Sequence, residues 1–199
     1  MYKRFMERFT AVSFSGAKLN IYRATPTNRP KAVVHISHGM AEHAKRYAWF
    51  MQVLKEAGYA VYAHDIRGHG YTYAKNSSKG HFSDKHGLDQ LLHDLDFVID
   101  LIKQNHSKIP IFCFGHSLGS ILLFRYVTHA YHRINGIACW NSGIETNLLA
   151  MIGRIILSTE RKFLNPRKRS HFAWILTFQS WANKIKNKRM GWGGGGGGG

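Results

Sequence analysis

Acidic side chains are scarce in this sequence of 199 residues. Eleven aspartates and glutamates stand against 28 lysines and arginines, which gives a formal net charge of +17 at pH 7 with histidine neutral. A surplus of this size favours attraction to phosphate, either in lipid headgroups or in nucleic acid. The surplus is concentrated, because residues 150–190 contain ten basic residues and the single acid Glu160. We call this stretch the basic segment and interpret it as separable from the rest of the chain.

Cysteines are few, and long apolar runs are absent. The two cysteines, Cys113 and Cys139, lie inside short apolar runs, where a thiol behaves as a small hydrophobic side chain. A disulfide framework is therefore not expected. No uncharged apolar stretch reaches the roughly 18 residues of a membrane-spanning helix, and residues 1–8 lack the apolar centre of a secretory leader. We expect a cytoplasmic protein with at most peripheral contact with a membrane.

Short apolar runs follow one another along the first 140 residues. Residues 7–13 and 18–25 predict an antiparallel hairpin. Four further runs are apolar on both faces and are separated by helical stretches: residues 32–36, 59–63, 109–114 and 134–140. Strands of this kind are typical of βαβ units, in which helices cover both faces of a parallel sheet. The sequence therefore predicts the α/β class with a mostly parallel sheet.

Two predicted helices differ in how much of their surface should be buried. Residues 88–105 carry leucine and isoleucine at steps of three and four, so one face of this helix should pack in the core. Residues 120–126 are apolar almost all round, which predicts a deeply buried helix. A third helix over residues 47–57 should end at Gly58.

Residues 115–119, Gly-His-Ser-Leu-Gly, fit the G-x-S-x-G pattern of a nucleophile elbow. Five positions alone are a weak signal, but an apolar run precedes them and a predicted helix follows, which is the context that the pattern requires. Gly115 and Gly119 permit a tight turn that exposes the hydroxyl of Ser117. We therefore expect Ser117 to have a positive or nearly forbidden φ and to be the nucleophile. The alternative is an idle serine in a glycine-rich turn.

Two further loops follow predicted strands of the same sheet, at residues 38–40 and 65–70. Open α/β sheets place their sites at the carboxyl ends of strands, so these loops and the elbow should converge on one crevice. The N–H of Met40 is then the natural second oxyanion donor beside the N–H of Leu118. Met40 can also be interpreted as a residue that fills a gap in the core, and the two interpretations are compatible.

Other polar residues of these loops favour structural roles. A cluster that opens a helix is more often an ion-paired brace than a site, and this applies to Glu42, His43, Arg46 and Tyr47. We interpret His69 in the same way, and His35, His64 and Asp65 as satisfied core groups. The thirteen histidines and two cysteines form no metal-binding signature, so no metal is expected.

Three motifs together resemble, in order and spacing, the monoacylglycerol lipase and lysophospholipase-like branch of α/β-hydrolases. They are His-Gly-Met-Ala-Glu-His with Arg-Tyr at 38–47, Asp with Arg-Gly-His-Gly at 65–70, and the elbow. The resemblance covers roughly residues 7–147. It implies the α/β-hydrolase fold and hydrolysis of an acyl ester of a lipid, such as a monoacylglycerol or lysophospholipid, through an acyl-serine and without a cofactor. It further implies that Gly39 and His116 bind the substrate.

The acid and the base of a catalytic triad are hard to find. A serine nucleophile needs a histidine base that a carboxylate orients, and in this fold both follow the serine in the chain. Few candidates come after Ser117: Glu145, Glu160, His129, His132 and His171. Glu145 with His171 is the one in-chain alternative, because Glu145 lies just beyond a predicted strand.

We therefore expect a chain that stops before its triad acid and base. Each further strand-helix unit takes about 30 residues or more, whereas only 82 residues, 199 minus 117, follow Ser117. The predicted parts are an α/β-hydrolase core at 1–142, incomplete at its C-terminus, a partial cap with the basic segment at 143–190, and a glycine tail at 191–199. Such a tail cannot bury enough surface to offset its backbone entropy.

One other function remains open, and a second is weaker. A truncated relative could keep the fold without catalysis and bind a lipid or a protein partner, with the basic segment on an anionic membrane. Nucleic-acid binding by that segment is not expected, because the segment lacks a recognised motif and regularly spaced aromatic residues.

We predict that the basic segment binds anionic vesicles in a salt-dependent way. Near a charged surface each lysine or arginine contributes about 1 kcal/mol before screening and entropy. The chain should therefore sediment with phosphatidylserine vesicles at low salt and be released as salt is raised. A variant with glutamine at the ten basic positions is the control. Binding that stays unchanged from low to high salt contradicts an electrostatic cause.

Overall fold

The computed structural model describes residues 6–142, 158–160, 163 and 170. The chain divides into two compact units, Met1–Gly143 and Ile144–Gly199. In the second unit the described residues at 158–160 and 163 are helical, and the Ser170 hydroxyl donates a hydrogen bond to the Glu160 carboxylate. Most of the predicted cap, most of the basic segment and all of the glycine tail lie outside the described residues and stay predictions.

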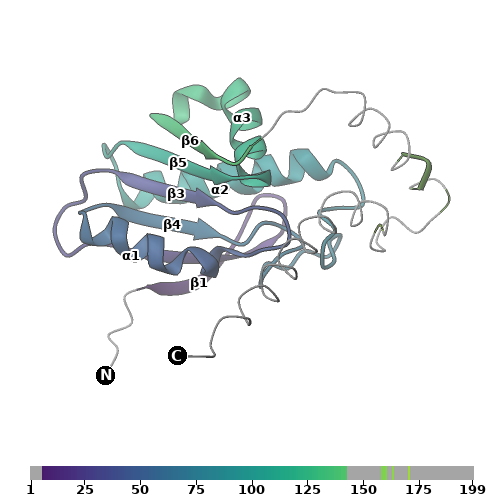
Figure 1. Cartoon of the computed structure of the whole chain (residues 1–199), viewed down its shortest axis with the longest axis horizontal. Coiled ribbons are helices and arrows are strands. Elements are labelled where there is room, and N and C mark those ends of the chain that lie inside the picture. The colour runs from purple at the N-terminus through teal and green to yellow at the C-terminus, as the bar shows by residue number, and fades with distance from the viewer. Residues whose placement is uncertain (1–5, 143–157, 161–162, 164–169, 171–199) are drawn as a thin grey trace, which may run out of the picture. The chain divides into compact units, whose positions relative to one another are not determined.

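Six strands of the first unit form one sheet (Figure 1). They are β1 (Glu7–Val12), β2 (Lys18–Ala24), β3 (Val33–Ser37), β4 (Ala60–His64), β5 (Ile111–His116) and β6 (Gly136–Trp140). Their order across the sheet is β1-β2-β4-β3-β5-β6. The pairs β1–β2 and β2–β4 are antiparallel, and the other three pairs are parallel. The predicted hairpin and the predicted mostly parallel α/β sheet are both confirmed.

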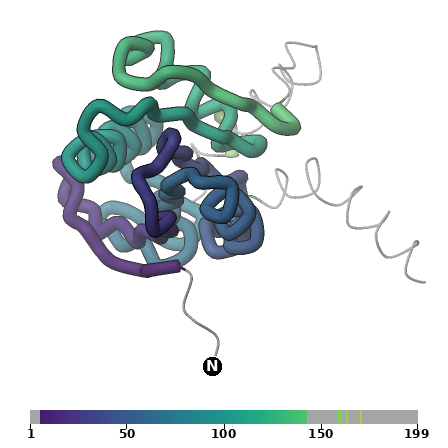
Figure 2. The backbone as a smooth tube through the Cα atoms, turned by 90° about the vertical axis from the view of Figure 1, so that its left-hand side faces the viewer, coloured from purple at the N-terminus to yellow at the C-terminus, as the bar shows by residue number. Residues whose placement is uncertain are grey.

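Helices lie on both faces of this sheet. The helical elements are η1 (Ala44–Tyr47), α1 (Ala48–Glu56), α2 (Gly87–Asn105), α3 (Leu118–Ala130) and η2 (Tyr131–Arg133). Met51 of α1 packs in one core cluster with Val61 of β4, whereas Leu95 of α2 and Leu122 of α3 pack in the other with Tyr62. Figure 2 shows the coils of α1 (blue) and α2 (teal) on opposite sides of the strands. Adjacent residues of one strand therefore serve different cores, which explains why the runs are apolar on both faces.

The helix α2 follows its sequence pattern closely. Leu95, Ile99 and Ile102 have no exposed surface, and each such side chain contributes about 1.5–3 kcal/mol of burial free energy. The helix after the elbow does not follow its pattern. Leu122 and Leu123 are buried, but Ile121 and Phe124 are 46% and 39% exposed. The prediction of a deeply buried helix therefore holds for the side that carries Leu122 and Leu123 and is wrong for the side that carries Ile121 and Phe124.

A buried ion pair joins α2 to two loops of the first unit. The Nε of Arg67, in the loop after β4, lies 2.5 Å from the carboxylate of Asp94, and both side chains are almost fully buried. The other Asp94 oxygen accepts the hydroxyls of Ser13 and Ser15 from the turn between β1 and β2, at 2.6 Å each. Removal of one partner would leave the other as a buried unpaired charge, at a cost of about 3–5 kcal/mol.

Three histidines are buried near the carboxyl ends of β3 and β4. The Nε2 of His35 and the Nδ1 of His64 lie 3.0 Å apart, but Nδ1 of His35 has no hydrogen-bond partner among the residues that the structure describes. The interpretation of His35 as fully satisfied is therefore wrong at one nitrogen. Burial lowers the pKa of both imidazoles, and the carboxylates of Asp65 and Asp94 only partly oppose this for His64. Burial likewise lowers the pKa of His38 to about 4.

We predict that this protein loses stability as pH falls below about 6.5, the ordinary pKa of histidine. Below that pH the imidazoles bind protons in the unfolded chain but stay neutral in the folded state, so unfolding becomes more favourable. The shift of the His38 pKa to about 4 alone corresponds to about 3 kcal/mol of folding stability, which is lost progressively between pH 6.5 and 4.

The urea midpoint of unfolding, measured between pH 8 and 4.5, tests this prediction. Replacement of His35 by asparagine should flatten the slope in part, whereas replacement of the exposed His132 by glutamine should leave it unchanged. A midpoint that does not move between pH 7 and 5 would contradict the prediction.

Candidate active site

The elbow residue Ser117 lies in a one-residue turn between β5 and α3. Its φ of 49° and ψ of −111° lie in the sparsely populated region expected for it, so the predicted backbone geometry is confirmed. The Ser117 N–H donates to the Trp140 carbonyl of β6 at 2.9 Å, and its carbonyl accepts from Ile121 of α3 at 3.1 Å. These bonds hold a conformation that costs about 1–3 kcal/mol. The half-buried Ser117 hydroxyl has no hydrogen-bond partner among the described residues.

Two glycines let α3 approach the sheet closely. A Cβ at Gly119 would lie 2.0 Å from the Ser37 carbonyl oxygen at the end of β3. A Cβ at Gly115 would lie 2.7 Å from backbone atoms of Ser120. The Ser120 hydroxyl in turn donates to the Gly115 carbonyl at 2.7 Å. The glycines of the elbow motif are thus required by backbone contacts on both sides of Ser117.

In the loop after β3, the N–H groups on either side of Met40 have side-chain acceptors. The Gly39 N–H donates to Glu42, and the Ala41 N–H donates to Nε2 of His69 at 3.3 Å. The Met40 N–H between them has no partner in the part of the chain that the structure describes. Ala41 takes up a left-handed φ of 60°, and the Met40 side chain is 48% exposed. The interpretation of Met40 as a core gap-filler is therefore wrong.

Leu118 is the first residue of α3, so its N–H lies outside the hydrogen bonds of the helix itself. It too has no partner among the residues described. Met40 and Leu118 follow the ends of β3 and β5, which are neighbours in the sheet. Within the described residues two N–H groups without partners thus follow the ends of adjacent strands, and the one at the helix N-terminus lies where negative charge is favoured.

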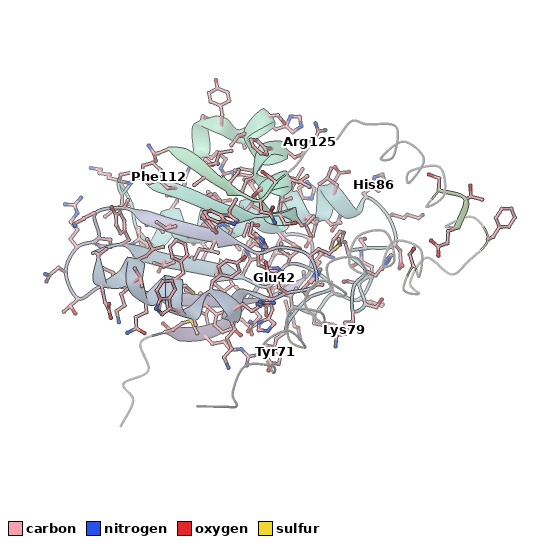
Figure 3. All side chains as sticks on the ribbon, viewed as in Figure 1. Glu42, Tyr71, Lys79, His86, Phe112 and Arg125 are labelled. Atoms are coloured by element: carbon pink, nitrogen blue, oxygen red, sulfur yellow. The ribbon has the colours of Figure 1, made fainter. Side chains whose placement is uncertain are left out.

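Glu42 connects the loop after β3 to the elbow. Its carboxylate accepts the Tyr47 hydroxyl at 2.8 Å and Nδ1 of His116 at 2.7 Å, and it lies 3.7 Å from Nε of Arg46. The predicted brace with Arg46 and Tyr47 is confirmed. His43 is exposed and makes no hydrogen bond or ion pair to Glu42 in the described part of the chain. The contact with His116 was not predicted. Glu42 lies at the end of β5 where His116 is located, whereas Phe112 lies near the start of that strand, and Figure 3 shows the two labelled residues well apart.

The hydrogen bonds of Glu42 determine its charge state. Burial alone would raise the pKa of the carboxyl, but hydrogen bonds from His116, Gly39 and Tyr47 outweigh burial and lower that pKa. Glu42 is therefore a carboxylate at neutral pH. Because a carboxylate only accepts, His116 must donate its Nδ1–H to Glu42.

His38 is held as a neutral imidazole of one tautomer. Its Nε2 accepts the Ile66 N–H at 2.9 Å, so the proton lies on Nδ1, which donates to the Gly39 carbonyl at 2.7 Å. Burial, which lowers the pKa of His38 to about 4, agrees with this assignment. His38 therefore links the loop after β3 to the loop after β4.

Asp65, the first residue after β4, anchors the second loop. One of its oxygens accepts the Ala44 N–H at 2.8 Å, and the other accepts the Asn20 amide at 2.8 Å and the Tyr71 N–H at 2.9 Å. A Cβ at Gly70 would lie 2.1 Å from that second oxygen, which explains the glycine at this position. The interpretation of Asp65 as a satisfied buried group is confirmed.

Glu145 and His171, the in-chain alternative for the triad acid and base, lie outside the described residues. Within the range 6–142 no histidine makes a hydrogen bond to Ser117. His129 and His132 are exposed. In that same range, no group of three or more histidine, cysteine or acidic side chains could hold a metal ion, and no helix combines the length and the apolar character that crossing a membrane requires.

Comparison with known proteins places this chain among hydrolases. Residues 28–186 match the family described as "Serine aminopeptidase, S33". The monoacylglycerol lipase of Mycolicibacterium smegmatis is 36% identical over 102 residues, which cover 51% of this chain and 34% of the lipase. The phospholipase YtpA of Bacillus subtilis is 32% identical over 111 residues, or 55% of this chain and 40% of the phospholipase.

A solved structure with the same fold is the carboxyl esterase of Bacillus coagulans, with a TM-score of 0.65 and 22% identity. It covers 92% of this chain, and this chain covers 65% of it. The matched part of the chain thus spans little more than a third of the length of the two lipid hydrolases and two thirds of the esterase.

We predict that Gly119→Ala destabilises the protein and displaces the elbow. Helix propensity alone would favour alanine by about 1 kcal/mol. Overpacking typically costs about 1–3 kcal/mol, and we expect the upper end here because the clash at 2.0 Å is with the Ser37 backbone carbonyl, which must move.

Gly16→Ala is the matched control. Gly16 has a φ of 77° but open space around a new Cβ, so the change should cost only about 1 kcal/mol of backbone strain. Urea unfolding of both variants measures the difference. Equal or smaller destabilisation by Gly119→Ala would refute the close approach of α3 to β3.

Proposed function

This chain belongs to the serine aminopeptidase family of α/β-hydrolases, and on that premise we propose that it provides the nucleophile and oxyanion hole for hydrolysis of a lipid acyl ester. The observation that carries the proposal is the elbow, in which Ser117 takes a strained φ of 49° and α3 begins directly behind it. Within the described part of the chain the Ser117 hydroxyl has no hydrogen-bond partner. The support for a lipid ester comes from the relatives, which are named monoacylglycerol lipase and phospholipase.

In the proposed reaction the Ser117 oxygen attacks the ester carbonyl carbon and gives up its proton to a histidine base. The carbonyl oxygen becomes an oxyanion, which the N–H groups of Met40 and Leu118 stabilise. The C–O bond to the alcohol then breaks, the alcohol takes the proton from the base, and the acyl group stays on Ser117. Water, deprotonated by the same base, then attacks the acyl carbon. The C–O bond to Ser117 breaks, the Ser117 oxygen takes the proton from the base, and the carboxylic acid leaves. In this proposal Gly39 and His116 bind the substrate.

The proposed base and its acid come from outside residues 6–142. His38 and His69 are unsuitable, because the acceptor nitrogen of each already accepts a backbone N–H. In the fold the acid and the histidine follow the serine along the chain. Glu145 with His171 stays the hypothesis within this sequence, and further strand-helix units of a longer hydrolase are the other source.

We predict that a fluorophosphonate labels Ser117, slowly in the 199-residue chain and faster in a version extended with the C-terminal segment of a relative. Without a base, hydrolysis of a short-chain nitrophenyl ester should exceed the reaction in water by about 10³ to 10⁴-fold at most, since only binding and the oxyanion hole remain. The extended version should gain rate because it supplies the base.

Ser117→Ala should abolish labelling and turnover, and alanine at the exposed Ser107 is the matched control that should change neither. Robust turnover by the 199-residue chain that Ser117→Ala abolishes would show that a base lies within this sequence, and His171→Ala would test the first candidate. A chain that binds lipid but is never labelled at Ser117 would favour the non-catalytic alternative.

A further inference from the structure

A single carboxylate contacts both loops that supply the proposed oxyanion donors. Glu42 accepts the N–H of Gly39, the residue before Met40. It also accepts Nδ1–H of His116, two residues before Leu118, at 2.7 Å. The Glu42 side chain is only 10% exposed, so these bonds form largely out of contact with water. The carboxylate thus links the segment that carries one donor to the segment that carries the other.

The residue after Met40 is held by a second side chain. His69 donates its Nδ1–H to the Arg67 carbonyl at 3.0 Å, which leaves Nε2 as an acceptor for the Ala41 N–H at 3.3 Å. The His69 ring packs against His38 and Phe82, so its orientation is fixed on both sides. It can therefore hold the left-handed turn at Ala41.

These contacts select one N–H out of three. Gly39 and Ala41 have their N–H groups taken by Glu42 and His69, and the Met40 N–H is left for a ligand. A Cβ at Gly39 would lie 2.7 Å from the Glu42 oxygen and 2.8 Å from Nδ1 of His116, so only glycine permits this bridge. Position 39 is thus constrained by the Glu42–His116 contact itself.

We propose that Glu42 and His69 are positioning residues of the oxyanion hole: Glu42 sets the spacing between the Met40 and Leu118 donors, and His69 sets the direction of the Met40 N–H. The inference rests on the proposed function of these two donors. Neither side chain touches the reacting atoms, and each acts through the backbone that it holds. A hole built from backbone N–H groups is effective only when its donors are fixed before reaction, because reorganisation would otherwise cost part of the stabilisation.

The test compares two reagents that differ in one atom. A fluorophosphonate places a P=O oxygen in the oxyanion hole when Ser117 attacks, whereas the corresponding fluorophosphonothioate places a P=S sulfur there, and sulfur is a weak acceptor. The ratio of the two labelling rates therefore reports the hydrogen bonds of the hole. Partial unfolding lowers both rates equally and leaves their ratio unchanged.

In the 199-residue chain, Glu42→Ala should lower the fluorophosphonate rate by about 100-fold, the effect of losing one oxyanion donor, and should lower the oxygen-to-sulfur ratio by about tenfold or more. Glu42→Gln keeps an acceptor oxygen and should restore most of both quantities. His69→Leu should lower the ratio, and His69→Gln, which places an amide oxygen near the former Nε2, should restore it in part.

Two controls separate positioning from stability. Tyr47→Phe removes one hydrogen bond to Glu42 but keeps those from Gly39 and His116. The oxygen-to-sulfur ratio should therefore stay within about twofold of the value for the unmodified chain, a much smaller change than the loss of an oxyanion donor causes. Ile99→Val in the core of α2 destabilises the fold and should leave the ratio unchanged.

An unchanged ratio in Glu42→Ala, with Ser117 still labelled, overturns this inference and leaves the proposed function standing. A chain whose Ser117 is never labelled overturns the proposed function and the inference with it.

Discussion

β3 and β5 lie side by side in parallel, in the register that sets Ser37 opposite Gly115. Both strands end within a residue of that pair, so the loop after β3 and the elbow leave the sheet next to each other. The absence of a Cβ at Gly119 lets the first turn of α3 lie against the Ser37 carbonyl. A shift of this register by one residue would move Met40 away from Leu118 and reverse the faces of every side chain on the strand. The remaining contacts of the site presuppose this pairing.

Several polar side chains near the proposed site are buried, and their hydrogen bonds hold the loops in place. Asp65 holds the loop after β4 through three donors, and Asp94 with Arg67 ties the first hairpin and that same loop to α2. Apolar replacements of such groups can be as stable as the originals, so stability alone does not account for them. We infer that they give each loop one arrangement, which the proposed site of backbone N–H groups requires.

The sequence was sufficient for the parts of the fold that depend on local pattern. The two-sided apolar runs predicted the strands to within about two residues, and the glycines around Ser117 predicted its strained turn. One wrong prediction and one missed contact have physical causes. An apolar surface such as that of α3 shows what a helix can bury but not what covers it, and the pattern of α2 gave no sign that Asp94 would face Arg67 in the core. The Glu42–His116 contact spans 74 residues and exists only because β3 pairs with β5.

The histidines around the proposed site make structural hydrogen bonds, so the proposed catalytic base has to come from another part of the protein. His38 and His69 each donate from one nitrogen and accept a backbone N–H at the other, so a proton taken from Ser117 would cost either of them a bond that shapes its loop. His116 directs Nδ1 at Glu42 and makes no hydrogen bond to Ser117 within residues 6–142. These imidazoles are thus committed to holding the backbone in place. The proposed oxyanion donors, which Glu42 and His69 position in our proposal, are amides that do not titrate near neutral pH. Stabilisation of an oxyanion by them would depend on geometry, and the pH dependence of the proposed reaction would come from a base that other residues supply.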